Sequence, residues 1–209
     1  MTEKEGIAMQ EKKPDTKAQI FNTALRLFAA NGVEKVSMRN LADAVGIKAA
    51  SIYNHYSNKE QIVESCYKFF LESQDVVLLN KDQYALVLQN GTKEEVVNLI
   101  SGQLPGALEK NLIYAMTMVV SRIYTDAKAT EIYAKALDHF MQFLTEFCDL
   151  GIKLGRFEEF NIRGFVMLAL SVRLFAVRSA IIRPEVLFDW DSAQQEMISE
   201  LMKMLPFKY

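Results

Sequence analysis

Two cysteines and two histidines are all that the 209-residue chain has of these residue types, which limits the metal and redox chemistry open to it. Cys66 and Cys148 stand alone, without a C-x-x-C spacing, so neither a zinc site nor a disulfide framework is indicated. His55 and His139 lie far apart in the sequence. The chain also lacks the G-x-S-x-G, H-E-x-x-H and P-loop motifs, and we therefore expect no catalytic residues, no metal and no cofactor.

Signals for export and for a membrane are also lacking. The first fifteen residues, MTEKEGIAMQEKKPD, are charged throughout and contain no apolar core, so they do not form a signal peptide, and residues 1–14 are predicted to be a disordered leader. Arg173 and Arg178 interrupt the long apolar segment 165–182. Each would cost at least ~2.5 kcal/mol near the centre of a bilayer. We expect a cytoplasmic protein in which this segment is a buried helix, with no membrane partner.

Net charge is small but unevenly distributed. The whole chain carries a formal charge of −2, which argues against nonspecific coating of a polyanion. Residues 1–60 hold nine Lys/Arg and seven Asp/Glu, a net charge of +2, and the other 149 residues hold fifteen and nineteen, a net charge of −4. A mildly basic head on an acidic body is compatible with local contact to nucleic acid.

Strand signals are scarce, whereas amphipathic helical spacing runs through most of the chain, so the predicted fold class is all-α. The first helix is expected to begin at Thr16, in a capping box with Gln19, and the second follows Ser37. After a turn at Gly46, a short helix runs from about residue 49 to 55, and a further helix is capped by either Ser57 or Asn58. Longer helices are predicted near 93–109, 111–124, 128–155, 160–182 and 191–205.

Two short helices joined by a glycine turn, at about 37–56, are typical of a helix-turn-helix, whose second helix enters the major groove of DNA. A purely structural bundle fits the same pattern. Lys48 and Lys59 favour DNA, because a cation at a helix N-terminus is disfavoured by ~0.3–1 kcal/mol unless an anion such as phosphate faces it. Ala49 would let the backbone approach DNA closely, and three further side chains supply donors for phosphate: Ser51, Tyr53 and His55.

The segments IFNTALRLFAANG, VSMRNLADAVGI and SIYNHYSNKEQI, between Thr16 and Ile62, resemble the DNA-binding domain of the tetracycline-repressor (TetR) family. The resemblance implies an N-terminal three-helix head over residues 15–74 and a helical ligand-binding and dimerisation domain over 75–209. It also implies roles for individual side chains. Backbone and base contacts would come from Ser37 and Arg39, base-edge contacts from Lys48, Ala49 and Asn54, and phosphate contacts from Ser51, Tyr53, His55 and Lys59.

Three positions depart from the family pattern. Val45 precedes Gly46 where alanine is usual, Lys48 replaces the usual serine cap, and Ala50 replaces a small glycine. These differences bear on which operator is bound. The implied function is a ligand-responsive transcriptional regulator that binds a palindromic operator in double-stranded DNA as a homodimer. A small, largely apolar effector would release it. Repression is the default; activation, or a helix-turn-helix used for protein interaction, are the alternatives.

The resemblance places the dimer interface on the last two long helices, as a four-helix bundle with the partner copy, although an internal core fits the same stripes. The predicted interface residues are Phe165, Leu168, Val172, Phe175, Ile182, Ile198, Leu201, Met202 and Leu205. Met- and aromatic-rich segments between head and interface suggest an effector pocket, although an ordinary core has the same composition. The pocket candidates are Tyr114, Met118, Arg122, Tyr133, Phe140, Phe143 and Phe147. Arg122 could pair with an acidic ligand, but a salt bridge to Asp126 is the simpler interpretation.

Overall fold

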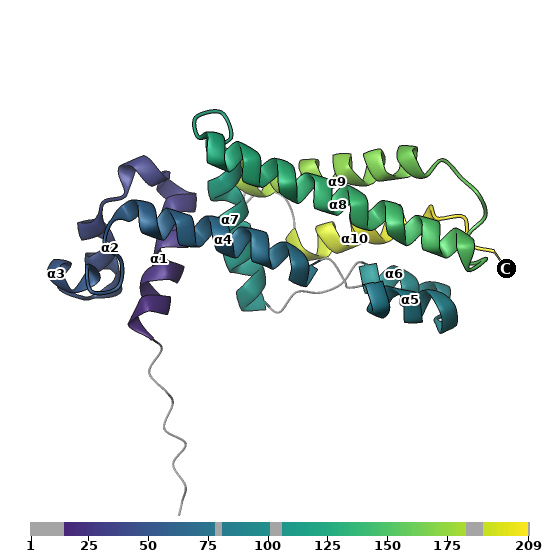
Figure 1. Ribbon diagram of the computed structural model, residues 1–209, viewed down its shortest axis with the longest axis horizontal. Helices are drawn as coiled ribbons and strands as arrows, with labels where there is room; N and C mark the ends of the chain where they lie inside the picture. The colour runs from purple at the N-terminus through teal and green to yellow at the C-terminus, as the bar shows by residue number, and fades with distance from the viewer. Residues whose placement is uncertain (1–14, 78–80, 101–105, 183–189, 209) are drawn as a thin grey trace, which may run out of the picture.

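The computed structural model describes residues 15–77, 81–100, 106–182 and 190–208, and over these ranges the fold is all-α, as predicted (Figure 1). The predicted leader, 1–14, lies outside the described residues. The elements are α1 (Thr16–Asn31), η1 (Val33–Lys35), α2 (Met38–Val45), α3 (Ala49–Ile52), α4 (Lys59–Val77), α5 (Lys81–Asn90), α6 (Lys93–Ile100), α7 (Gly106–Arg122), α8 (Ala127–Lys153), α9 (Ile162–Ile182) and α10 (Trp190–Lys203).

Local capping fixes the ends of the helices in the head. The Ser37 hydroxyl accepts from the Asn40 backbone N–H at 3.1 Å, and the Asn40 side chain accepts from the Ser37 backbone N–H at 2.9 Å. This capping box starts α2, and Gly46 ends it with a φ of 78° that favours glycine. Two expectations needed correction. Asp15, not Thr16, is the N-cap of α1, and α3 ends at Ile52 rather than near residue 55.

The start of α4 settles a choice that the sequence left open. The Asn58 side chain accepts from the Gln61 backbone N–H at 2.8 Å, and the Ser57 backbone N–H donates to the Gln61 side chain at 2.7 Å. Asn58 with Gln61 is therefore the capping pair. In the body, α5 was not predicted, because only Tyr84 and Leu88 are buried among its described side chains and its polar positions resemble a loop. The helix expected at 93–109 is α6, which ends at Ile100, and α7 already begins at Gly106.

Two hydrophobic clusters hold the molecule together. The first contains the cores of α1, α2 and α4 and continues into α7 and α8, where Met118 and Ala136 belong to it. The second joins α5, α6, α8, α9 and α10, with Phe147 and Phe157 fully buried in it. The head therefore has no separate core: packing continues across the predicted domain boundary near residue 74. Figure 1 shows the result, an elongated molecule with α2 and α3 at one end and the C-terminus at the other.

The segment after α8 closes the far end of the body. Phe157 pairs with Phe207 in an isolated antiparallel bridge, and the Glu158 backbone N–H donates to the Pro206 carbonyl at 2.9 Å. The Phe157 ring lies 5.0 Å from the Phe207 centroid and 5.8 Å from that of Phe147. Among the described residues, no helix combines the length and the apolar character needed to span a bilayer.

Candidate nucleic-acid interface

The helix α3 is a single turn with one side packed on the core of the head and the other side exposed to solvent. Ile52 is fully buried and Tyr56 is 3% exposed, so both hold α3 to the core of the head. Tyr53 is 54% exposed, and Asn54 and Ala49 are also exposed. Because α3 packs against α2, its exposed side chains lie at the outer end of the molecule (Figure 1). A short helix fixed by two apolar anchors, with small and polar groups outside, can enter a groove of DNA.

Lys48 occupies the N-cap position of α3 with an extended backbone, φ −65° and ψ 141°, and its side chain makes no capping bond. The first N–H groups of α3 thus receive no side-chain cap from it, which leaves donors available for an external acceptor. Lys48 is exposed, and Arg39, in the first turn of the neighbouring α2, is exposed as well. The structure therefore brings Arg39, Lys48, Ala49, Tyr53 and Asn54 to one end of the molecule on two packed helices.

The remaining predicted contact residues have structural partners or are less exposed. Ser37 is occupied by the capping box with Asn40. Ser51 and His55 are half-buried. Lys59 donates from Nζ to the Val33 carbonyl at 3.0 Å, so it ties α4 to η1. This bond accounts for a lysine at the start of α4 without DNA. Of the two lysines at helix N-termini, only Lys48 still lacks an intramolecular explanation. The two other Nζ hydrogens of Lys59 could still bind phosphate.

Comparison with known proteins identifies this arrangement. Residues 20–66 match the family model described as "Bacterial regulatory proteins, tetR family". The head of the chain, over residues 20–66, therefore belongs to the TetR family. Among its relatives, the biofilm operon icaADBC negative transcriptional regulator IcaR of Staphylococcus epidermidis is 37% identical over 70 residues, which are 32% of this chain and 36% of that protein. The transcriptional regulator TtgR of Pseudomonas putida is 25% identical over 141 residues, 68% of this chain and 58% of that protein.

Both matches span less than two thirds of the relative's own length. A similar solved structure is that of the fatty acid degradation regulator FadR from Bacillus halodurans, with a TM-score of 0.59 and 18% identity, covering 95% of this chain and 100% of that one. At this identity the likeness concerns the fold, and it extends through the body as well as the head. These relatives are regulators, the class that the sequence predicts in place of an enzyme.

Six of the seven residues predicted to line an effector pocket are divided between the two hydrophobic clusters. Met118 belongs to the first cluster, with Tyr114 and Tyr133 packed against it. Phe147 belongs to the second, with Phe140 and Phe143 packed against it. The seven residues therefore do not form one group, because α8 is long enough to serve both clusters. Tyr84, which was not predicted, joins the second group through edge-on contacts to Phe143 and Phe147 with centroid separations of 5.7 and 5.9 Å.

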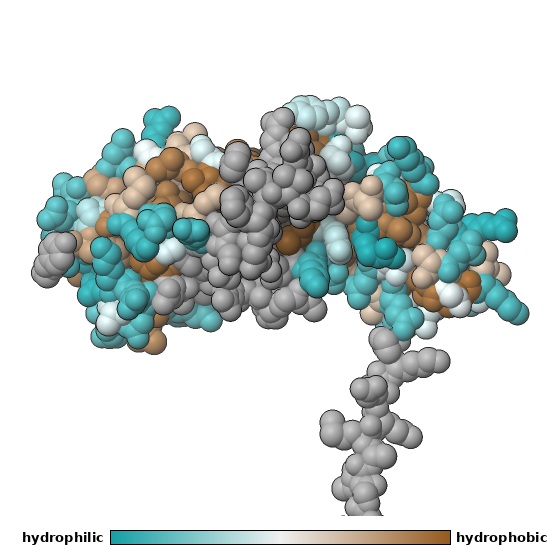
Figure 2. Space-filling model, turned by 180° about the vertical axis from the view of Figure 1, so that it is seen from behind, coloured by the Kyte–Doolittle hydropathy of each residue, from teal (hydrophilic) through white to brown (hydrophobic). Residues whose placement is uncertain are grey.

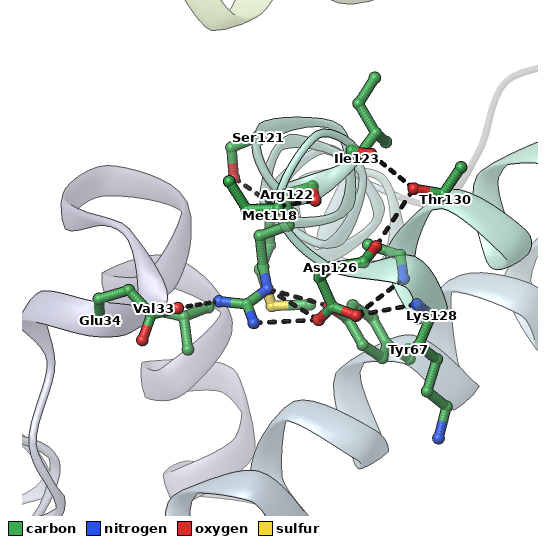
Figure 3. Close-up of polar contacts among 12 residues, drawn as sticks. Val33, Glu34, Tyr67, Met118, Ser121, Arg122, Ile123, Asp126, Lys128 and Thr130 are labelled. Atoms are coloured by element: carbon green, nitrogen blue, oxygen red, sulfur yellow. Dashed lines mark hydrogen bonds and ion pairs between the residues drawn. The ribbon is translucent and has the colours of Figure 1, made fainter.

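Arg122, the charged pocket candidate, is bonded within the protein. Its Nη2 lies 3.0 Å from an Asp126 carboxylate oxygen, which confirms the simpler interpretation of the sequence. Its Nη1 lies 2.5 Å from a Glu34 oxygen in η1, and its Nε donates to the Tyr67 hydroxyl at 3.0 Å (Figure 3). We call Glu34, Tyr67, Arg122 and Asp126 the Arg122 junction. Sequence reasoning missed Glu34 and Tyr67, because neither lies at helical spacing from Arg122.

Electrostatics within the Arg122 junction keep its charges in place. Burial acts to raise the pKa of Asp126, but hydrogen bonds from Tyr67, Arg122 and two backbone N–H groups outweigh it and lower the pKa to about 2. Burial acts to lower the pKa of Arg122, and its hydrogen bonds to Asp126, Glu34 and Tyr67 more than offset this. Burial, followed by the hydrogen bond to Asp126, raises the pKa of Tyr67. At neutral pH the junction therefore contains a carboxylate, a guanidinium and a neutral phenol.

Part of the predicted dimer interface needs correction, because it lies inside the protomer. The second hydrophobic cluster already covers four of these side chains, which are 2–8% exposed: Phe165, Leu201, Met202 and Leu205. Leu168 is 42% exposed and Val172 is half-buried. The side chains of Phe175, Ile182 and Ile198 lie outside the described part of the structure.

Some large apolar side chains of α9 are exposed, among them Leu168 of the predicted interface. Met167, Leu168 and Leu174 are 51%, 42% and 38% exposed, which is unusual for large apolar side chains on one helix. Seen from behind in Figure 2, apolar surface gathers at the upper left, where α9 lies, beside the grey region. Exposed apolar surface of this kind often marks a protein interface.

Proposed function

We propose that this TetR-family chain is a transcriptional regulator that binds duplex DNA through α2 and α3 in the cytoplasm, with repression as its default action. The observation that carries the proposal is α3 itself, which is anchored by Ile52 and Tyr56 and presents Lys48, Tyr53 and Asn54 outward. IcaR, whose head is 37% identical over the matched residues, is a negative regulator, which supports repression. Activation would need a further surface for the transcription machinery.

We infer that the chain acts as a homodimer on a palindromic operator. A recognition helix of one turn makes few contacts, so one head alone would bind weakly and a two-fold dimer would double the contacts. Half-sites would then lie about 34–36 Å apart, one turn of DNA. The exposed side chains Met167, Leu168 and Leu174 of α9 support a dimer face that shares Leu168 with the stripe expected from the sequence.

The proposed effector is a small, largely apolar molecule bound in the body. Tyr84, Phe143 and Phe147 form an aromatic group at the second cluster, and such side chains bind apolar ligands through area and shape. An effector would release DNA only if it bound the free dimer more tightly than the operator-bound dimer. FadR is named for fatty acid degradation, which makes fatty acids a sensible first class to test.

Selection of bound duplexes from a random pool by the purified full-length chain tests the proposal. We expect a palindromic motif with half-sites one helical turn apart. Titration of the selected duplex with candidate effectors then tests release. Recovery of sequences without any common motif would count against specific DNA binding.

Lys59→Ala is expected to weaken binding to all duplexes and to lower the dependence of log Kd on log salt by about one unit, because one phosphate contact is lost. Loss of the bond to Val33 alone would lower stability without changing this slope, so the slope separates the two roles of Lys59. Lys68→Ala is the matched control, since Lys68 is an exposed lysine of the same helix, 3.6 Å from Glu72. An unchanged slope for Lys59→Ala would rule out the phosphate contact.

Leu168→Asp is expected to convert the dimer to a monomer, because a charge would be buried in an apolar contact between two copies of α9. Light scattering after size exclusion measures the mass. Leu86→Asp, at a 63% exposed position on α5, is the matched control and should leave the dimer intact. A Leu168→Asp protein that remains dimeric would place the interface elsewhere.

A further inference from the structure

The turn between α7 and α8 meets the DNA-binding head through polar bonds that converge on one carboxylate. Asp126 is the N-cap of α8, and its Oδ1 accepts from the backbone N–H groups of Lys128 and Ala129 at 2.9 and 3.3 Å. Its Oδ2 accepts from the Tyr67 hydroxyl of α4 at 2.7 Å and from Arg122 at the end of α7. One side chain thus fixes three helices to one another (Figure 3).

Arg122 extends this cluster to the helix-turn-helix. Its remaining nitrogen, Nη1, bonds to Glu34, which lies in η1 between α1 and α2 and is 88 residues away in sequence. Arg122 and Asp126 side chains are each 19% exposed, whereas that of Glu34 is 78% exposed. The Arg122 junction therefore has a half-buried part within α4, α7 and α8 and an exposed contact to η1.

Because the Glu34 side chain is more exposed than those of Arg122 and Asp126, the Glu34–Arg122 pair is expected to contribute differently from the other bonds of the junction. Exposed ion pairs contribute little to folding, because solvent screens them and ordering the side chains is unfavourable. The Glu34–Arg122 pair can therefore break while the half-buried bonds among Tyr67, Arg122 and Asp126 remain. Breaking it would remove the polar contact between η1 and α7, while Val33 stays buried in the first cluster and its carbonyl still accepts from Lys59.

We propose that Glu34 and Arg122 are positioning residues that hold the helix-turn-helix at the angle to the body that DNA binding needs. The inference rests on the proposed DNA-binding function, but it concerns a pair that does not contact DNA. A displacement of α7 or of the start of α8 moves Arg122 and Asp126 together. The Glu34 contact then transmits that movement to η1 and α2, in parallel with the movement of α4 through Tyr67. Lys128, which pairs with Glu64 of α4, supports the same joint from the α8 side.

Glu34→Gln tests this proposal, because a positioning role and the removal of a negative charge predict opposite changes in DNA affinity. Removal of a negative charge from a DNA-binding head strengthens DNA binding through simple electrostatics. Loss of the contact between η1 and α7 instead weakens it, because fewer molecules hold the binding-competent arrangement. We expect Kd for the selected operator to rise by about 5-fold, the lower end of typical coupling between sites. Glu60→Gln removes an exposed carboxylate from the same head and should leave Kd unchanged or lower it.

Hydrogen exchange of the free protein provides a readout that does not involve DNA. Backbone amides of residues 33–45 should exchange faster in Glu34→Gln than in the wild type and in Glu60→Gln, with an unchanged melting temperature. A Glu34→Gln protein that binds DNA as tightly as Glu60→Gln, or whose amides exchange like the wild type, would overturn the positioning role. If the wild type selects no operator, the proposed function fails, while the exchange measurement still tests the joint.

Discussion

Phe157→Ala should lower the free energy of unfolding by about 3–5 kcal/mol, the range for loss of a buried phenylalanine. Phe157 is fully buried, and its ring contacts those of Phe147 and Phe207. Its truncation would leave a cavity that rigid helices cannot fill, and would loosen the C-terminal segment that pairs with it through the bridge to Phe207. Urea unfolding followed by circular dichroism measures the change.

Gly151 provides a matched control, because the Phe157 ring packs directly against its backbone. A Cβ at Gly151 would lie 2.1 and 2.2 Å from two ring carbons of Phe157. Gly151→Ala should therefore destabilise the wild type by about 1–3 kcal/mol through overpacking. In the Phe157→Ala background the clash is gone, and the same substitution should be stabilising by up to ~1 kcal/mol, since alanine favours helix over glycine. Equal effects of Gly151→Ala in both backgrounds would show that the two residues do not pack as described.

Asp126→Asn is expected to destabilise the chain at pH 7 by about 2 kcal/mol, the free energy that corresponds to lowering the pKa of Asp126 from 3.8 to about 2. Asparagine is also a good N-cap, so the start of α8 should be retained and the effect should report the lost charge. The neutral amide would leave Arg122, which is 19% exposed, without the less exposed of its two counter-charges. Asp138→Asn, at an exposed position of α8, should change stability by no more than about 0.5 kcal/mol.

The pH dependence of this difference is a second test. The pKa of Asp126 in the folded chain is about 2, below its unfolded value, so its contribution to stability is fully present above about pH 5. That contribution falls as the pH drops from about 5 towards 2, because Asp126 then binds a proton in the unfolded chain, whereas in the folded chain it binds one only near pH 2. The gap in unfolding free energy between wild type and Asp126→Asn should shrink over the same window. A gap that stays constant from pH 7 to pH 3 would contradict the low pKa.

Local signals in the sequence were sufficient to predict the head. Ser37 and Asn40 cap α2 within three residues of each other, and Gly46 ends the helix by its own backbone freedom. Ile52 is buried at the spacing that the helical period requires. Such features depend on neighbours along the chain, so they can be predicted without tertiary contacts. Lys48, at the N-cap of α3, makes no capping bond, as its type suggests. Lys59 instead donates to the Val33 carbonyl, 26 residues away.

Long-range contacts decided the arrangement of the Arg122 junction and of the two hydrophobic clusters. Arg122 bonds to Asp126, as helical spacing predicted, but its bond to Glu34 spans 88 residues and the Tyr67–Asp126 bond spans 59. Neither pair leaves a periodic trace in the sequence. The pocket candidates looked like one group because composition cannot show that α8 passes from one hydrophobic cluster to another.

The proposed dimer face on α9 shows the same limit. The sequence alone determined that this chain is all-α, with a helix-turn-helix head and a long apolar helix near its end. In that helix Phe165 and Val166 are buried while their neighbours Met167 and Leu168 are exposed, although all four are large and apolar. Periodicity cannot distinguish faces when apolar residues surround the helix. Only the packing of α9 against α7, α8 and α10 decided which side chains are covered within the chain and which are exposed.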